Sequence, residues 1–334
     1  MKRTTWLLLS ALAILVFPWT LMGQGTVTVY VASPELASQK FRGTLARANF
    51  ELQGVVPIAT SLSFPTAVVC APGNVLYVAE FALRSGGTVP NDTPETRIVQ
   101  YATDGKRGDI VASIPEAFVV GMTLNDAGQL FMGTGVFPDA VAFSGIWKAD
   151  PKSANATPVQ IVKPGDLQAL LDLLDTVINP RDPQVRALAF VPNVPDGRPF
   201  SGDLLFTAGA GTLQNWDLYR VSASGGTPEK IGAVGHPWHS VASGAGGEVF
   251  LADFANGNIA RLDEGLQSTN PFAELIEPFQ MALDAQGTLY VTTKEFEFDN
   301  VPPSGKKNST LWRFDSSGRL PLGAAGAWGV TVCE

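Results

Sequence analysis

The chain has 334 residues, of which 45% are hydrophobic and 16% are charged, a composition typical of a folded protein with a large core and not of a disordered one. The formal net charge is −8 and the sequence contains no basic stripe, so we expect no nucleic-acid partner. This length would suit two average domains, but an all-β barrel or propeller of this size is often a single domain.

Residues 1–25 have the pattern of a secretory signal peptide. Two basic residues precede an uncharged apolar run from Trp6 to Met22, and a small-x-small cleavage pattern follows it. A retained membrane anchor is the alternative, but Pro18 and the shortness of the run argue against it, because a spanning helix needs about 20 apolar residues. We therefore expect a secreted protein, extracellular or periplasmic, without stable membrane insertion.

A short apolar strand pattern recurs along the rest of the chain and predicts the second strand of a repeating unit. Its copies are residues 29–33, 76–80, 130–134, 205–209, 249–253 and 289–293. A third strand with one long polar side chain follows each copy, at residues 45–48, 98–101, 146–149, 218–221, 259–262 and 311–314. Alternation along a strand places that polar side chain on the face opposite its apolar neighbours.

The first strand of the unit has its copies at residues 67–70, 121–124, 187–190, 240–243, 280–283 and 329–332. The copy at 329–332 has no following strand, and the N-terminal second and third strands have no preceding one, so the two fragments complete one another. The pattern predicts an all-β, six-bladed β-propeller in residues 26–334, a single domain whose N- and C-terminal strands share the closing blade. We expect residues 26–32 to pair antiparallel with 327–332.

Two segments carry a family resemblance. Gly246–Asp253 followed by Asn258–Asp263 resembles an NHL-type repeat, and Asp284–Val291 is similar. The chain thus resembles the superfamily that contains NHL proteins, the gluconolactonase (senescence-marker) lactonases, strictosidine-synthase-like proteins and virginiamycin-type lyases. The resemblance implies a six-bladed propeller and does not by itself imply a function.

In gluconolactonase-type enzymes, metal-binding carboxylates and amides lie where the first strands enter the central channel. The matching positions in this sequence are Thr66, Val120, Arg186, His239, Phe279 and Trp328. They offer one hydroxyl and no carboxylate, whereas a hard cation needs several oxygen ligands. Metal-dependent lactonase activity is therefore in doubt, and we expect no cofactor, with a divalent cation such as calcium left open.

We expect the channel mouth to bind a ligand, through Thr66, Glu80, Arg186, His239, Asp253, Phe279 and Trp328. Glu80 and Asp253 end second strands beside the channel and are candidate partners for Arg186, more as structural ion pairs than as catalytic groups. The aromatic residues with one arginine and one histidine suit an apolar or anionic ligand. The alternative is a plugged channel in which Phe279 and Trp328 only fill the axis.

Four long loops are predicted on the mouth face, at residues 81–95, 135–143, 163–185 and 294–308. The loop at 163–185 contains a predicted helix, capped by Asp166, whose apolar stripe is Leu167, Leu170, Leu171, Leu174 and Val177. It either covers the edges of the blades or forms a lid over the channel.

Cys70 and Cys333 are the two cysteines of the chain, near the same end of neighbouring first strands. In a secreted protein they are candidates for a disulfide, and two buried free thiols are the alternative.

Two classes of function remain open. The first is a monomeric, secreted propeller that binds a small molecule or a protein at its loop-rich face. The second is a hydrolase or lyase, lactonase-like, with a non-standard site in the channel, and the sequence assigns it no catalytic residue. A divalent cation in the channel would favour the enzyme, and a dry aromatic funnel would favour binding.

Overall fold

The structure is a computed structural model of the chain. It describes residues 27–35, 42–51, 53–83, 94–136, 143–153, 156–171, 184–195, 200–209, 216–231, 237–265, 269–293, 311–322 and 327–334.

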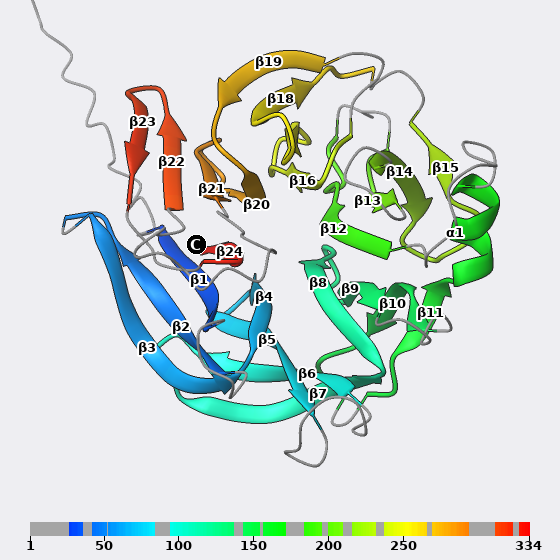
Figure 1. The fold of residues 1–334 in the computed structure, drawn as a ribbon, viewed down its shortest axis with the longest axis horizontal. Coiled ribbons are helices and arrows are strands. Elements are labelled where there is room, and N and C mark those ends of the chain that lie inside the picture. The colour runs from blue at the N-terminus through cyan, green and yellow to red at the C-terminus, as the bar shows by residue number, and fades with distance from the viewer. Residues whose placement is uncertain are drawn as a thin grey trace, which may run out of the picture.

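Six four-stranded antiparallel sheets surround a central axis in these residues, which confirms the six-bladed propeller (Figure 1). From the axis outwards, blade one holds β4 (Pro65–Ala71), β5 (Val75–Leu83), β6 (Pro94–Ala102) and β7 (Arg107–Pro115). Blade two holds β8 (Ala117–Leu124), β9 (Leu130–Val136), β10 (Gly145–Ala149) and β11 (Val159–Val162). Blade three holds β12 (Gln184–Phe190), β13 (Asp203–Gly209), β14 (Trp216–Ser222) and β15 (Glu229–Lys230).

The other three blades repeat this order. Blade four holds β16 (Ser240–Ser243), β17 (Val249–Asp253), β18 (Asn258–Leu262) and β19 (Thr269–Glu274). Blade five holds β20 (Pro278–Leu283), β21 (Leu289–Thr293), β22 (Leu311–Asp315) and β23 (Gly318–Pro321). Blade six holds β24 (Gly329–Cys333), β1 (Thr28–Glu35), β2 (Arg42–Asn49) and β3 (Gly54–Ser63).

Blade six closes the ring with strands from both ends of the chain. Strand β24 is its innermost strand and pairs antiparallel with β1, with Thr28 opposite Cys333 and Ala32 opposite Gly329. The predicted closure is therefore confirmed over the described residues. Each of these strands supplies the backbone partners that would otherwise leave an open sheet edge in the other.

The first strands of neighbouring blades lie close together because small residues separate them. A Cβ added to Gly329 on β24 would lie 3.0 Å from the Ala67 Cα on β4, and one added to Gly121 would lie 3.1 Å from the Ala187 Cα. The approach of β24 to β4 also brings Cys70 and Cys333 together in a disulfide, with their Cα atoms 5.5 Å apart.

One apolar core fills each interface between blades. Strand β1 contributes to two of these cores, because successive side chains of a strand point to opposite faces. Val29 and Val31 pack against blade five, whereas Tyr30 and Ala32 pack against blade one. Both faces of the strand are buried, which explains why its sequence is an almost continuous apolar run. The fold therefore rests on six interfaces of this kind, placed around the axis.

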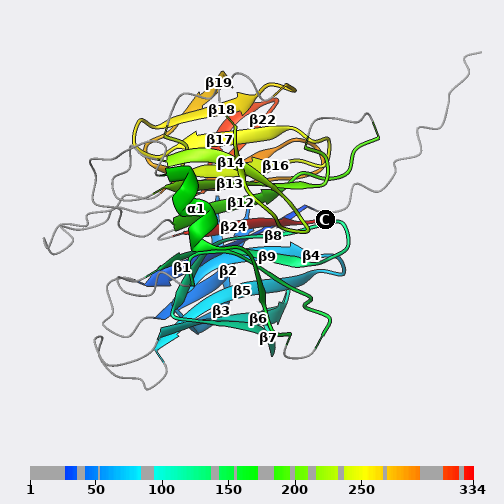
Figure 2. The same cartoon turned by 90° about the vertical axis from the view of Figure 1, so that its right-hand side faces the viewer.

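Helix α1 (Pro164–Leu171) differs in detail from the predicted helix. Asp166 does not precede the first turn but lies inside it, where its carboxylate accepts the N–H of Lys163 at 2.9 Å. Lys163 takes the capping position because Pro164, with its fixed φ, suits the first helical residue. Leu167 packs between blades two and three, and Figures 1 and 2 place α1 at the outer edge of the ring. The described part of the helix covers an edge and does not cover the channel mouth.

The predicted loop at 81–95 is shorter than expected, because β5 and β6 stay paired as far as Leu83 and Pro94. Strand β9 likewise extends to Val136. The remaining parts of the predicted loops, at residues 84–93, 137–142, 172–183 and 294–308, lie outside the described residues. The predicted leader, residues 1–25, lies outside them as well.

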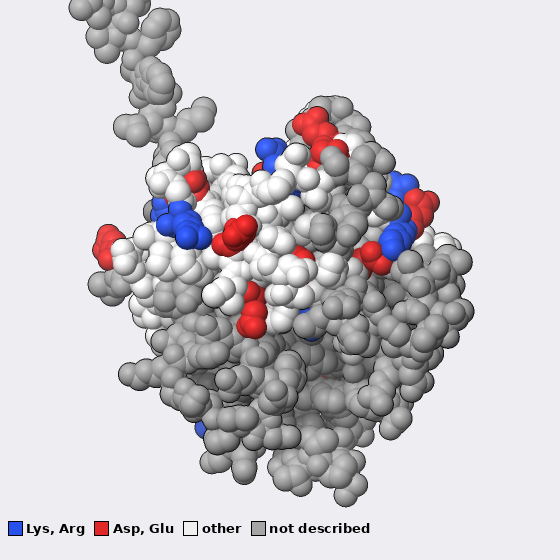
Figure 3. Space-filling view, turned by 45° about the horizontal axis from the view of Figure 1, so that its top comes forward, with Lys and Arg blue, Asp and Glu red and all other residues white. Residues whose placement is uncertain are grey.

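The helix in the described part of the chain is too short and not apolar enough to cross a membrane. Figure 3 shows one face of the surface, where acidic and basic side chains are scattered over the described part without a basic stripe.

Candidate functional site

The six positions predicted at the channel mouth lie at related places, within or just before the first strands of the six blades. Four of them, Thr66, Val120, Arg186 and Phe279, lie where the register of a first strand shifts against its second strand. His239 and Trp328 stand just before β16 and β24, and their N–H groups bond to the oxygens of Ala252 and Ala32. A β-bulge turns a side chain away from the regular alternation of its strand. The same irregularity recurs in four of the first strands around the axis.

Aromatic side chains fill much of this mouth. Phe64, Phe81, Phe279 and Trp328 form one buried cluster, against which Phe118 and Phe254 pack. The ring centroids of Trp328 lie 5.5 Å from Phe64 and 5.7 Å from Phe279, in edge-to-face contacts. The predicted plug is therefore present on the side of blades five, six and one.

The side chain of Thr66 has a structural role. Its hydroxyl is buried and donates a hydrogen bond to the Val119 oxygen of the next blade, 2.5 Å away. Thr207 and Thr292 make similar bonds from second strands, to the main-chain oxygens of His239 and Trp328. These hydroxyls join one blade to the next and are not offered to a ligand.

Glu80 does not meet Arg186, so the predicted pair between them is wrong. The carboxylate accepts hydrogen bonds from the Tyr101 hydroxyl at 2.7 Å and from the Ser63 N–H at 3.1 Å, and Arg107 lies 3.7 Å from it. Glu80 faces the interface with blade six because Leu76, Val78 and Glu80 share one face of β5. Burial, and then the bond to Glu80, raises the pKa of Tyr101.

Asp253 does not meet Arg186 either. Its carboxylate is fully buried and accepts the N–H groups of Ala255 and Asn256, together with the Asn256 side-chain amide at 2.6 Å. It therefore stabilises the turn between β17 and β18. The Nδ1 atom of His239 lies 3.8 Å from Oδ1 of Asp253. The same Nδ1 accepts a hydrogen bond from the Phe254 N–H at 3.0 Å, so this nitrogen carries no proton.

Arg186 remains with Trp216, His239 and Phe254 as what we call the mouth cluster. The guanidinium carbon of Arg186 lies 4.8 Å from the centroid of the Trp216 ring and 6.0 Å from that of Phe254. The His239 ring is 5.9 Å from Trp216 and 6.0 Å from Phe254. Blades three and four thus supply one cation and three rings to one side of the mouth.

Two donors of the mouth cluster have no hydrogen-bond partner among the residues that the structure describes. They are Arg186 Nη1 and Trp216 Nε1, both buried atoms. No carboxylate forms an ion pair with Arg186 in the part of the chain that the structure describes. Burial without a compensating charge lowers the pKa of Arg186 to about 10.

The sequence pointed to Arg186 and His239 but missed Trp216 and Phe254. Trp216 begins the third strand of blade three, and Phe254 follows the second strand of blade four. Neither belongs to a first strand, so the repeat gave no reason to place them at the mouth. The only available signal was their position at strand ends that face the same side of the ring.

The six mouth positions do not fit a hard cation. Thr66 supplies the only hydroxyl among them, and that hydroxyl already donates to Val119. In the described residues, no group of three or more His, Cys, Asp or Glu side chains is placed to hold a metal ion. We therefore derive no metal-dependent step at this site.

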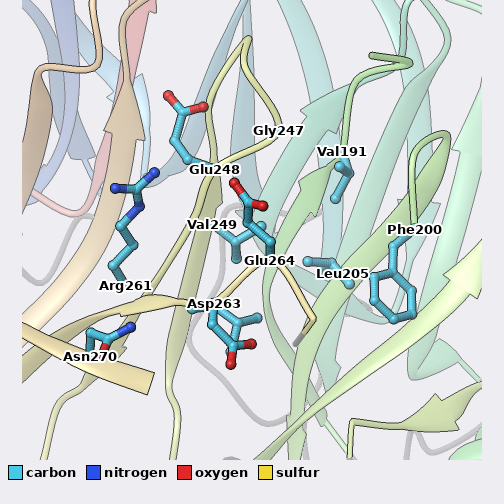
Figure 4. Close-up of a pocket in the computed structure, with 11 residues that line it drawn as sticks. Val191, Phe200, Leu205, Gly247, Glu248, Val249, Arg261, Asp263, Glu264 and Asn270 are labelled. Atoms are coloured by element: carbon cyan, nitrogen blue, oxygen red, sulfur yellow. The ribbon is translucent and has the colours of Figure 1, made fainter. Parts of the chain in front are cut away.

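A separate hollow of about 270 Å³ lies between blades three and four (Figure 4). Val191, Phe200 and Leu205 form an apolar wall, and Glu248 and Arg261 stand opposite. It includes Gly247 in the turn that joins β16 to β17, so it lies at the strand ends remote from the mouth. None of the residues predicted to bind a ligand lines it.

No family model matches the chain, and no curated protein sequence matches it. Among solved structures, a nidogen–laminin complex contains a chain with 12% identity and a TM-score of 0.56, over 92% of this chain and 98% of that one. A protein of unknown function from Bacteroides caccae has 12% identity and a TM-score of 0.54, over 92% and 99%. TolB from Acinetobacter baumannii has 13% identity and a TM-score of 0.58, and the match covers 91% of this chain and 66% of TolB. At such identities the likeness shows the fold alone.

Proposed function

We propose that this protein is a secreted, monomeric binding protein that holds a small molecule at the mouth cluster. The observation that carries the proposal is the Nη1 atom of Arg186, which is buried and has no hydrogen-bond partner, in a side chain that forms no ion pair with a carboxylate among the described residues. A buried cation without a partner is unfavourable, and a ligand that accepts its hydrogen bonds would offset that penalty. A group that destabilises the empty protein in this way is a better candidate for binding than for folding.

The other polar groups predicted at the mouth have partners within the protein, which supports the mouth cluster as the binding site. Thr66, Glu80 and Asp253 each form hydrogen bonds to other groups of the protein, which stabilise the fold. Arg186 and Phe254 keep part of their surface exposed, whereas Arg186 Nη1 and Trp216 Nε1 are buried, so a ligand enters from the exposed side of Arg186 and displaces the atoms that cover the two donors. The aromatic plug beside it limits a ligand to the mouth and does not offer passage through the ring.

Secretion is supported by the leader pattern at residues 1–25 and by the disulfide between Cys70 and Cys333. Disulfides persist in oxidising compartments and are rare in reducing ones.

The test is a screen of small molecules by thermal shift and tryptophan fluorescence, repeated on Arg186→Met. Arg261→Met is the matched control, because Arg261 is exposed and lies on the far side of blade four. We expect a ligand that binds the wild type and the control but not Arg186→Met. A ligand with the same affinity for both variants would place the binding site elsewhere.

A further inference from the structure

We infer that the ligand of the mouth cluster is a small organic carboxylate with an aromatic body, bound through Arg186 Nη1 and Trp216 Nε1. This inference rests on the proposed function and gives the chemical class of its ligand. The two donors belong to β12 and β14, the first and third strands of blade three, and the contact between guanidinium and indole, 4.8 Å from the guanidinium carbon to the ring centroid, places the two side chains side by side.

The two unpartnered groups are of the same hydrogen-bonding kind. An arginine guanidinium and an indole N–H donate hydrogen bonds and accept none. Their complement is a group that only accepts, and an ionised carboxylate has two oxygens for two donors. An amide or an alcohol would bring its own N–H or O–H into a place where the two unpartnered groups are both donors. Such a buried donor without an acceptor is unfavourable.

The charge of Arg186 also restricts the class of ligand. Arg186 has no acidic partner in the described part of the chain, so a ligand with one negative charge would neutralise it. A phosphate monoester carries more negative charge than one arginine neutralises. It also needs more hydrogen-bond donors than one guanidinium edge and one indole provide. The surrounding rings of Trp216 and Phe254 supply apolar surface and no further cation. One carboxylate therefore fits the count of charges and donors better than a phosphate does.

Aromatic rings lie next to the two donors. The ring of Phe254, which is partly exposed, lies 6.3 Å from the buried ring of Phe279, and Phe279 lies 5.7 Å from the buried ring of Trp328. An aromatic wall therefore begins at Phe254 beside Arg186 and continues into the plug. Aromatic rings bind one another in edge-to-face or offset contacts and exclude water from the charged end. A flat aromatic body attached to the carboxylate matches this wall.

The experiment compares 1-naphthoate with 1-naphthamide, which share the aromatic body and differ in charge and donors. Inorganic phosphate is the third probe. Titrations use the full-length mature protein and the variants Arg186→Met, Arg186→Lys and Trp216→Phe, with Arg261→Met as the control. Circular dichroism and melting curves show whether each variant is folded.

We expect naphthoate to bind the wild type roughly tenfold or more tightly than naphthamide, because a buried charge-assisted hydrogen bond contributes about that much. Arg186→Met should remove the preference, and Arg186→Lys should restore part of it because it keeps the charge and loses the planar fork. Trp216→Phe should weaken naphthoate about fivefold, because it removes the indole N–H that would donate to the carboxylate. Trp216 is buried, so the smaller ring also lowers the melting temperature, and affinities are compared at a temperature where both proteins are folded.

Three outcomes would overturn the inference. Equal binding of naphthamide, still sensitive to Arg186→Met, would keep the proposed site and remove the carboxylate. Tighter binding of phosphate would replace the carboxylate by a different anion. Lack of naphthoate binding at millimolar concentration would mean that water or another part of the chain satisfies the two donors. Naphthoate binding that Arg186→Met leaves unchanged would instead contradict the proposed function itself.

Discussion

The side-chain amide of Gln280 donates a hydrogen bond to the main-chain oxygen of Val120. Gln280 belongs to β20 in blade five and Val120 to β8 in blade two, so the bond joins blades on opposite sides of the axis. Both residues lie where the register of their strand shifts. The bulges that turn side chains toward the axis thus also bring a donor and an acceptor together across it.

Replacing Gln280 with leucine should lower the free energy of unfolding by about 1–2 kcal/mol, because the Val120 oxygen would lose its donor in a partly buried place. Urea denaturation measures this change. Gln286→Leu, at an exposed turn position, is the control and should change stability little. A Gln280 variant as stable as the control would show that the bond across the channel contributes nothing.

Thr207→Val should destabilise the protein by about 1–3 kcal/mol, although valine has nearly the same shape. The Thr207 hydroxyl donates to the His239 oxygen at 3.1 Å and accepts the Ala187 N–H at 3.2 Å, so the change leaves two buried groups without partners. Thr207→Ser keeps the hydroxyl and should keep most of the stability. Equal losses in the valine and serine variants would point to packing instead of the hydroxyl.

The sequence predicted the number of blades and their closure because each strand must bury two apolar faces. The predicted position of the second strand in blade three was wrong by one residue. The predicted second-strand copy was 205–209, but Ala187 pairs with Thr207 as Ala67 pairs with Ala79, so the true copy begins at Leu204. Leu204, Leu205 and Phe206 are all apolar, and without alternation the register cannot be read from the residues.

The site was less predictable than the fold. The repeat placed Arg186 and His239 at the mouth because they share a position in the unit. It could not tell that Glu80 would turn toward blade six, since a residue at a strand end has a neighbour on either face. Trp216 and Phe254 reach the mouth from other strands, and contacts between strands distant in sequence leave no local pattern.

Replacing both Cys70 and Cys333 with serine should lower stability by up to roughly 5 kcal/mol, because the disulfide closes a loop of nearly the whole domain. The variant should still fold, since the Thr331 hydroxyl accepts the N–H of residue 70 at 3.0 Å and β24 stays paired with β1. Chemical denaturation of both proteins with and without reductant measures the effect. Reductant should destabilise the wild type alone, and an equal response of both would contradict the bridge.

Deleting residues 328–334 should abolish cooperative unfolding, because it removes β24 and leaves β1 as an unpaired edge at the centre of the ring. Deleting Glu334 alone is the control and should leave a single transition. Calorimetry and light scattering distinguish the folded control from an aggregating truncation. A truncated protein with the melting temperature of the wild type would contradict closure by β24.

Ligand binding at the mouth cluster should depend on pH. Burial lowers the pKa of Arg186 from 12.5 to about 10 in the empty protein, so this guanidinium loses its proton at lower pH than an exposed one. A bound carboxylate favours the charged form and raises the pKa again, so binding and protonation are linked. The affinity for 1-naphthoate should therefore be constant between neutral pH and about pH 9, where both partners keep their charge. Above pH 10 it should fall by up to about tenfold per pH unit, as the empty site loses its proton. Titrations at pH 8 and pH 10.5, with circular dichroism to verify folding, measure this, and 1-naphthamide is the control whose weaker binding should not change. Naphthoate affinity that stays constant through pH 10.5 would show that Arg186 keeps its proton at this pH and would contradict the lowered pKa.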